Sequence, residues 1–140
     1  MKILNSELNI VTKNNLELVN ITSDIEKFVV ESKIKNGFLT LFVPHATAAI
    51  IVNEDEEGLK SDFFKIPKIL KQAELLVGRF AHNKIDNNAA GHLAASIAGP
   101  STQFIIKDGK LIRGQWQDIF FFELDGPREK RQVLMQVMGE

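Results

Sequence analysis

Residues 102–124 read TQFIIKDGKLIRGQWQDIFFFEL, and this stretch decides the fold class. Its Asp108-Gly109 pair lies between two runs of alternating character, and Gly tolerates the positive φ that a two-residue hairpin turn requires. We therefore expect strands over 102–107 and 110–124, joined by this turn, and a further strand over 131–138. The C-terminal third of the chain is predicted to be an antiparallel sheet.

The rest of the chain adds both strands and helices. Ser23 and Glu26 have the spacing of a helix capping box, and Gly37 supplies a stop signal for the helix that they begin. Apolar periodicity predicts further helices and strands. The further helices span 67–77 and 92–98, and the further strands span 3–12, 16–21, 38–43 and 48–53, the first two forming a hairpin around Lys13-Asn14-Asn15. This order predicts a single domain over residues 1–140 of the α+β class, with a mostly antiparallel sheet.

Composition excludes several classes of protein. The 140 residues are 44% hydrophobic, which is too apolar for a disordered chain, and the formal net charge of −1 disfavours a general nucleic-acid binder. No cysteine is present, so the chain has no disulfide, thiol nucleophile or thiolate metal ligand. The N-terminal residues lack the apolar core of a signal peptide, and no apolar run reaches the roughly 18 residues of a membrane span. We expect a cytoplasmic protein without a membrane or nucleic-acid partner.

Three histidines are candidates for chemistry. His45 lies where a buried segment is broken between two strands, His82 opens an Asn-rich loop, and His92 begins the helix that closes this loop. Imidazole titrates near neutral pH, and three histidines with one open position form a catalytic zinc site in many enzymes. The spacing of 37 and then 10 residues matches no short metal motif. The alternative is three ordinary histidines, each hydrogen-bonded within its loop.

Charged side chains at strand ends are further candidates. Glu123 ends a run of three phenylalanines and needs a partner, which is either an arginine in an ion pair or part of a functional site. Asn53 and Glu54 follow a buried strand and either orient a histidine, bind a hydrated cation, act as a base, or belong to a solvated helix start. Arg128 follows a Gly-Pro turn and is either part of that turn or a fork for a phosphate or carboxylate. The candidate partners of Glu123 are Arg113, Arg128 and Arg131.

Taken together, these residues resemble the YjbQ family, also called the secondary thiamine-phosphate synthase family. The resemblance is carried by His45-Ala46-Thr47-Ala48, Asn53-Glu54, His82, His92-Leu93-Ala94-Ala95-Ser96 and Gly99-Pro100-Ser101. Its most specific part runs from Ser101 to Ile119 and contains Gly114-Gln115-Trp116-Gln117, and the tail from Glu123 to Arg128 also fits. The similarity extends over nearly the whole chain.

The resemblance implies a function as well as a fold. It implies an α+β homotrimer with the histidines near subunit interfaces, and a weak or secondary thiamine-phosphate synthase activity. That reaction joins a pyrimidine pyrophosphate to a thiazole phosphate and releases pyrophosphate. The alternative is a non-catalytic homotrimer that binds a small anionic ligand or a metal through the histidine cluster. The expected metal ligands are His45, His82 and His92, which would hold a divalent ion, zinc by preference. The expected catalytic groups are Glu123 and Glu54. The expected contacts to a small phosphorylated substrate are Arg128, Asn53, Ser101 and Gln117.

Two positions depart from the family pattern. Gln115 stands where the family usually has threonine, so any hydrogen bond made there is altered. Ala90 stands where many members have a further histidine, so a site that needs a fourth imidazole is incomplete.

Overall fold

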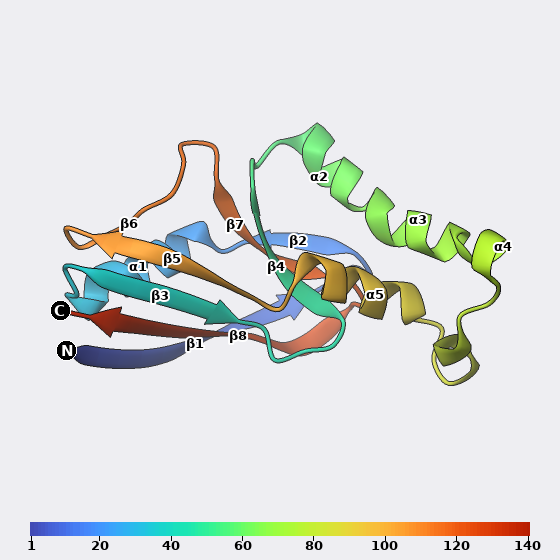
Figure 1. The fold of residues 1–140 in the computed structure, drawn as a ribbon, viewed down its shortest axis with the longest axis horizontal. Coiled ribbons are helices and arrows are strands. Elements are labelled where there is room, and N and C mark those ends of the chain that lie inside the picture. The colour runs from blue at the N-terminus through green and yellow to red at the C-terminus, as the bar shows by residue number, and fades with distance from the viewer.

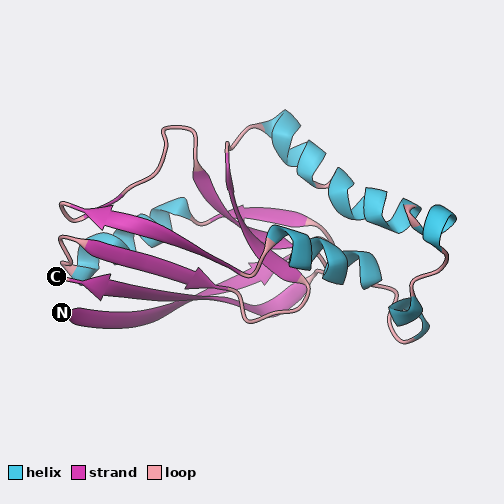
Figure 2. Ribbon diagram, viewed as in Figure 1, coloured by secondary structure: helices cyan, strands magenta, loops and turns pink.

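The computed structural model describes residues 1–140 as eight strands, five α-helices and one short 3₁₀ helix, η1 (Figures 1 and 2). The strands are β1 (Lys2–Thr12), β2 (Glu17–Asn20), β3 (Gly37–Phe42), β4 (Ala48–Asn53), β5 (Ser101–Lys107), β6 (Lys110–Leu111), β7 (Asp118–Glu123) and β8 (Arg128–Gly139). The helices are α1 (Thr22–Ser32), α2 (Glu57–Phe63), α3 (Lys65–Gln72), α4 (Glu74–Val77), η1 (Ala81–Lys84) and α5 (Ala89–Ala98).

The strands form two sheets in which every pair is antiparallel. One sheet has five strands in the order β1-β8-β3-β5-β6, and the other has three in the order β2-β7-β4. The main core lies between the sheets, where Leu39, Val133 and Phe121 pack together. Ile25 and Val29 of α1 complete this core. The predicted α+β class is confirmed.

Helices cover the other face of the three-stranded sheet. Because neighbouring residues of a strand point to opposite faces, Phe121 faces the main core while Phe122 faces the helices. Phe122 packs with Ala94 of α5 in a second, smaller cluster. Its ring also meets the rings of Phe63 and Phe64 edge-on, with centroids 6.3 and 6.2 Å away. The run of phenylalanines thus lets one strand contribute to two cores.

The predicted hairpin over residues 3–21 is wrong, although both of its strands form. β1 pairs with β8 in the five-stranded sheet, whereas β2 pairs with β7 in the other sheet. Between them the Glu17 carboxylate accepts hydrogen bonds from the backbone N–H groups of Lys13 and Asn14, at 2.9 and 3.1 Å. This bend leads the chain from one sheet to the other instead of folding it back on β1.

The helix predicted from Ser23 onward is confirmed as α1, but both of its ends differ. No capping box forms between Ser23 and Glu26, and Asn20 Oδ1 instead accepts the backbone N–H of Thr22 at 3.0 Å. The helix ends before Lys33, which takes the left-handed conformation (φ 59°) that was expected of a glycine.

The Asp108-Gly109 turn is confirmed, with φ of 52° and 77° at its two residues. The single strand predicted over 110–124 is wrong, because β6 covers only two residues and β7 begins after a loop. In this loop Gln117 Oε1 accepts the backbone N–H of Gly114 at 2.7 Å, which closes a tight turn. Trp116 lies at the turn and is 66% exposed, so it belongs to neither core.

The helix predicted over 67–77 is part of a longer helical arm. α2, α3 and α4 follow one another from Glu57 to Val77, separated by single residues, and Figure 1 shows them running outward beyond the strands. The carboxylate of Glu56 caps the arm by accepting the backbone N–H of Gly58 at 2.9 Å. α5 begins at Ala89, earlier than the predicted start. None of these helices is both long enough and apolar enough to cross a lipid bilayer.

Candidate functional site

A buried ion pair marks the end of β7. Glu123 is fully buried, and its carboxylate accepts hydrogen bonds from Arg131 Nε at 3.0 Å and from Arg131 Nη2 at 2.6 Å. Arg131 lies on β8 and is one of the three arginines expected as partners. The pair has to form inside the protein, because an unpaired carboxylate buried beside phenylalanines costs several kcal/mol.

The remaining hydrogen-bonding capacity of the Glu123 carboxylate is also filled. Thr12 Oγ1 donates to it at 2.7 Å, and the two backbone N–H groups that follow it donate at 3.1 and 3.3 Å. Thr47 Oγ1 accepts from Arg131 Nη2 at 2.9 Å on the other side of the pair. With five donors and no exposed surface, Glu123 has no lone pair free to take a proton from a substrate. The geometry therefore favours the ion-pair alternative, in which Glu123 holds Arg131 in one orientation.

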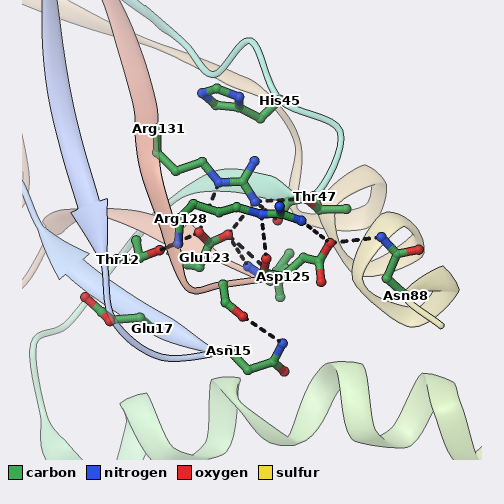
Figure 3. Close-up of polar contacts among 12 residues, drawn as sticks. Thr12, Asn15, Glu17, His45, Thr47, Asn88, Glu123, Asp125, Arg128 and Arg131 are labelled. Carbon is green, nitrogen blue, oxygen red and sulfur yellow. Dashed lines mark hydrogen bonds and ion pairs between the residues drawn. The ribbon is translucent and has the colours of Figure 1, made fainter. Parts of the chain in front are cut away.

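One nitrogen of Arg131 stays free. Nε and Nη2 are bound to Glu123 and Thr47, whereas Nη1 has no hydrogen-bond partner and points to the side of His45 (Figure 3). Arg131 lines an open pocket of about 810 Å³. The lining residues are Val11, Thr12, Lys13, His45, Pro127, Arg128, Glu129, Lys130 and Arg131. Arg128 and Arg131 are paired with Asp125 and Glu123, but Lys13 and Lys130 form no ion pair and outnumber Glu129, so the pocket carries a net positive charge.

Arg128 lines the same pocket from the beginning of β8. Its Nη2 donates to Asp125 Oδ2 at 2.9 Å and its Nε to the Asp125 carbonyl oxygen at 3.0 Å (Figure 3). Asn88 Nδ2 of the loop before α5 donates to the same carboxylate oxygen at 2.9 Å. The Arg128 side chain is nevertheless 51% exposed. It is thus both part of the turn and available to an anion, so the two expected alternatives are compatible.

His45 lies above this pocket, in the loop between β3 and β4. Its Nε2 accepts a hydrogen bond from the backbone N–H of Gln132 at 2.9 Å, so this nitrogen carries no proton and its lone pair is occupied. Burial and then the positive charge of Arg131 lower the pKa of His45, while the Glu123 carboxylate opposes them. A neutral imidazole bonded in this way does not bind a metal through Nε2.

The other two histidines meet each other elsewhere. The rings of His82 on η1 and His92 on α5 stand edge to face, with centroids 4.6 Å apart. His82 Nε2 is buried and has no hydrogen-bond partner. No group of three or more His, Cys, Asp or Glu side chains in the chain is placed to hold a metal ion. The three expected zinc ligands therefore do not form one set within a chain, since two come together and His45 lies beside Arg131.

Four further residues expected at the site lie away from the basic pocket. β4 and β7 pair so that Asn53 and Glu54 lie at the end of the sheet opposite to Glu123. Gln117 closes the loop between β6 and β7 with its own side chain. Ser101 begins β5 and is exposed. None of the four lines the pocket beside Arg131.

Lys13 and Lys130 were not expected at the site, and Arg131 was expected only as a partner of Glu123. A signal for Arg131 exists, because buried and exposed residues alternate along β8 and Arg131 falls in the buried set with Val133. A charged residue at such a position must face a buried opposite charge. The two lysines have no such signal, since nothing local distinguishes them from solvated surface residues.

The sequence and the fold both match one family. The family described as UPF0047 protein YjbQ-like matches residues 6–140. A UPF0047 protein of Methanothermobacter thermautotrophicus is 40% identical over 140 residues, which cover 100% of this chain and 95% of that relative. The UPF0047 protein YugU of Bacillus subtilis is 34% identical over 133 residues, which cover 94% of this chain and 97% of that relative.

Solved structures give the same result. The crystal structure of a YbjQ-like protein of unknown function from Sulfolobus solfataricus matches with a TM-score of 0.92 and 41% identity, over 99% of each chain. A hypothetical protein from Aeropyrum pernix matches with a TM-score of 0.89 and 34% identity, over 98% of this chain and 99% of the other. The family resemblance expected from the residues is confirmed.

Proposed function

This chain belongs to the YjbQ-like UPF0047 family, and we propose that it binds a small phosphorylated molecule in the basic pocket beside Arg131. The observation that carries the proposal is the free Nη1 of Arg131, held in place by Glu123 and Thr47. A donor fixed in advance binds an anion without the entropy cost of ordering a flexible side chain. Hydrogen bonds from a guanidinium to phosphate oxygens are also short and strong.

The charge and size of the pocket support the same ligand. Lys13, Arg128 and Lys130 line it with Arg131, and Glu129 is the only acidic residue in the lining. Its volume of about 810 Å³ lies within the roughly 300–1,000 Å³ typical of small-molecule sites. A molecule with one or two phosphate groups matches both the sign and the scale of the pocket.

The reaction that we propose for this site is a thiamine-phosphate synthase-type transfer in the cytoplasm. The ring nitrogen of the thiazole phosphate forms a bond to the side-chain carbon of the pyrimidine pyrophosphate, while the bond between that carbon and the pyrophosphate oxygen breaks. Both electrons of that bond leave with pyrophosphate, so negative charge develops on its oxygen, where fixed cations stabilise it. Arg131 and Arg128 supply such cations in this pocket. The support for the reaction itself is the residue pattern shared with the family.

Calorimetric titration with inorganic pyrophosphate tests the pocket. We expect saturable binding that weakens with added salt and is reduced about tenfold in Arg128→Gln and in Lys130→Gln, as expected for losing about 1.5 kcal/mol of charge-assisted contact. Lys107→Gln is the matched control, because it removes an exposed lysine of β5 that does not line the pocket. An equal loss in all three variants would mean non-specific attraction by charge and would overturn the proposed site.

Mass spectrometry of the product separates an enzyme from the alternative, a non-catalytic homotrimer that binds the same anion. The chain is incubated with the pyrimidine pyrophosphate and the thiazole phosphate, and we expect thiamine phosphate, formed more slowly by Arg128→Gln. Pyrophosphate binding without any product would support the non-catalytic homotrimer. Product formed at an unchanged rate by Arg128→Gln would put the chemistry outside this pocket.

His82 and His92 support a second candidate, a zinc site shared between copies of the chain. The unbonded, buried Nε2 of His82 lies next to His92, so the pair supplies two nitrogen ligands. Catalytic zinc sites generally have three protein ligands, and one chain brings no third group to this pair. The homotrimer would bring a second copy to complete the set. Because the chain alone does not complete it, no reaction step is assigned to the metal.

Elemental analysis of protein purified without a histidine tag tests this second candidate. We expect about one zinc ion per chain in the assembled protein, and none in His92→Ala, with the far-UV circular dichroism spectrum unchanged. Full zinc content in His92→Ala would sink the assignment.

A further inference from the structure

The two ring nitrogens of His45 have different surroundings. Nε2 accepts the backbone N–H of Gln132 at 2.9 Å, which ties the loop between β3 and β4 to β8. Nδ1 forms no hydrogen bond within the chain. The side-chain nitrogens and oxygens that are buried without a partner are His82 Nε2 and Asn88 Oδ1. Nδ1 of His45 is not one of these, so it is both unbonded and open to solvent.

The contact to Gln132 decides which of the two nitrogens carries a proton. A backbone N–H only donates, so Nε2 has to offer its lone pair to it. In a neutral imidazole the one proton is then on the other nitrogen, Nδ1. His45 therefore presents a fixed N–H donor to solvent, in the same way that Arg131 presents its Nη1.

These two free donors lie beside each other. His45 and Arg131 line the same pocket, the first from the loop between β3 and β4 and the second from β8. Figure 3 shows the imidazole ring on the side of the guanidinium to which Nη1 points. The other hydrogen-bonding positions of both side chains are occupied, by Gln132 for His45 and by Glu123 and Thr47 for Arg131. Only these two N–H groups are left for a ligand.

We propose that His45 is a neutral hydrogen-bond donor to the phosphoryl group that Arg131 binds, with Nδ1 and Nη1 donating to neighbouring oxygens of that group. This inference rests on the proposed function, and it names a residue that selects the ligand of that site. The terminal oxygens of a phosphoryl group are strong acceptors, so one group accepts from both side chains at once. Because His45 has no lone pair left, it rejects a ligand group that can only donate, such as an ammonium.

The surroundings of His45 disfavour its protonated form. A proton on Nε2 would break the contact to Gln132 and bring two donors face to face. Burial lowers the pKa of His45, the positive charge of Arg131 lowers it further, and the Glu123 carboxylate opposes both. The other charged residues that line the pocket are Lys13, Arg128, Glu129 and Lys130, three of which are cations. His45 thus remains neutral, and its part in the site is to donate a hydrogen bond, not to add charge or accept a proton.

Two substitutions of His45 separate the donor from the loop anchor. In His45→Gln the side-chain oxygen takes over the contact to Gln132, but no donor remains at the position of Nδ1. In His45→Asn the amide nitrogen lies close to the position of Nδ1, and the contact to Gln132 is lost. If His45 only anchors the loop, Gln is the conservative replacement, whereas for a donor to phosphate Asn is the better one.

Calorimetric titration of these variants with inorganic pyrophosphate tests the proposal. We expect His45→Gln to bind about tenfold more weakly than the wild type, as for the loss of one hydrogen bond to a charged group, and His45→Asn to recover part of that loss. Lys107→Gln is the control that should keep wild-type affinity, because Lys107 is exposed and does not line the pocket. Urea denaturation verifies that every variant is folded. Wild-type affinity in His45→Gln would reduce His45 to a loop anchor and overturn the proposal.

Titration with sulfate at two pH values separates a neutral donor from an imidazolium cation. Sulfate is a tetrahedral dianion whose charge is constant between about pH 8 and 6, and the lysines and arginines of the pocket remain charged over this range. We expect the ratio of wild-type to His45→Gln affinity for sulfate to be the same at both values. A ratio that rises as the pH falls would mean that a protonated His45 binds the anion, which contradicts the proposal.

Nitrogen NMR of the histidine side chains reads the tautomer directly. The signals of His45 are identified by their absence in His45→Gln. We expect the proton on Nδ1 and none on Nε2, both in the free chain and in the complex with pyrophosphate, with a shift of the Nδ1 signal on binding. A proton on Nε2 in either state would refute the assignment.

The same titrations distinguish a failure of this inference from a failure of the proposed function. If pyrophosphate binds the wild type, binds more weakly to Arg128→Gln and binds equally well to His45→Gln, the phosphate site stands and the role of His45 alone is refuted. If pyrophosphate does not bind the wild type, the phosphate site and the donor role fail together.

Discussion

The two ends of the β4–β7 strand pair both carry a carboxylate and a cation, and they differ in burial. At one end Glu123 and Arg131 have side chains that are 0 and 8% exposed. At the other end Asp55 and Lys60 pair at 2.9 Å with 34 and 23% of their side chains exposed. Asn20 joins that exposed pair to the sheet by donating to Asp55 at 2.8 Å.

The difference in burial decides what each cluster can do. Water competes with every contact of the exposed pair, so its contribution to stability is small and its side chains are free to rearrange. The buried pair is shielded from water except at Nη1 of Arg131, and Thr12 and Thr47 add further hydrogen bonds to it. It is costly to break, and for the same reason it presents Arg131 in a single orientation to the pocket.

The largest expected effect breaks the buried pair from one side. Arg131→Met should lower the free energy of unfolding by about 3–5 kcal/mol, because it leaves Glu123 buried and uncompensated. Urea denaturation at pH 7 measures this loss. The double variant Arg131→Met with Glu123→Gln should recover a large part of it, since no charge is then buried. A loss below 1 kcal/mol in the single variant would mean that the two ends of the sheet do not differ in the way described.

A smaller effect is expected from one hydroxyl of the buried cluster. Thr12 Oγ1 donates to Glu123 and also accepts the backbone N–H of Arg128 at 2.9 Å. Thr12→Val leaves the backbone N–H of Arg128 without its partner and removes one of the five donors to Glu123, so it should lower the free energy of unfolding by about 1–3 kcal/mol. Thr40→Val is the control, because Thr40 lies on the outer sheet face with one long contact of 3.4 Å to Gln103. Equal losses in the two variants would show that burial does not decide the outcome.

Local pattern predicted those parts of the fold whose cause is local. The apolar runs at β3 and β4 and the Asp108-Gly109 turn lie within a few residues of the predictions. The predicted hairpin failed because β1 has a better partner in β8, more than a hundred residues away in sequence. The strand over 110–124 failed because the Gln117 side chain closes a turn that composition does not reveal.

At the site, too, the sequence predicted only the features whose cause is local. The need of Glu123 for a partner was evident from its position after three phenylalanines, and Arg131 was among the candidates. The convergence of Lys13, Arg128 and Lys130 on one pocket depends on the pairing of β1 with β8, which no local pattern shows. The assembly of three histidines was inferred from resemblance, and one chain brings only His82 and His92 together.

His45 makes the stability of the buried end of the sheet depend on pH. Burial and Arg131 lower its pKa in the folded chain, so the unfolded chain, with the ordinary value of 6.5, binds a proton first as pH falls. The stabilisation is therefore complete above about pH 6.5 and is lost as pH falls through the lowered folded value. We expect the free energy of unfolding to fall as pH is lowered from 7.5 to 5, measured by urea denaturation in a buffer with chelator. His45→Gln should remove this slope while its side-chain oxygen accepts the Gln132 N–H in place of Nε2. An unchanged slope in His45→Gln would assign it to another group.

The smallest effect belongs to the exposed end of the sheet. Lys60→Gln removes the cation that, with Asn20, lowers the pKa of Asp55, and it should cost less than about 1 kcal/mol at pH 7. Because the pKa of Asp55 is lowered in the folded chain, its stabilisation is present above the ordinary value of 3.8 and is lost as pH falls through the lower folded value. Urea denaturation should show the cost of Lys60→Gln shrinking in 1 M salt, since screening already weakens an exposed pair.

Lys27→Gln, whose contact to Glu31 is 3.9 Å long and more exposed, should cost nothing measurable. Lys60→Gln would instead cost as much free energy of unfolding as Arg131→Met, with no dependence on salt, if burial made no difference between the two ion pairs. That result would contradict the comparison, because burial could then no longer explain why Arg131 is held in one orientation.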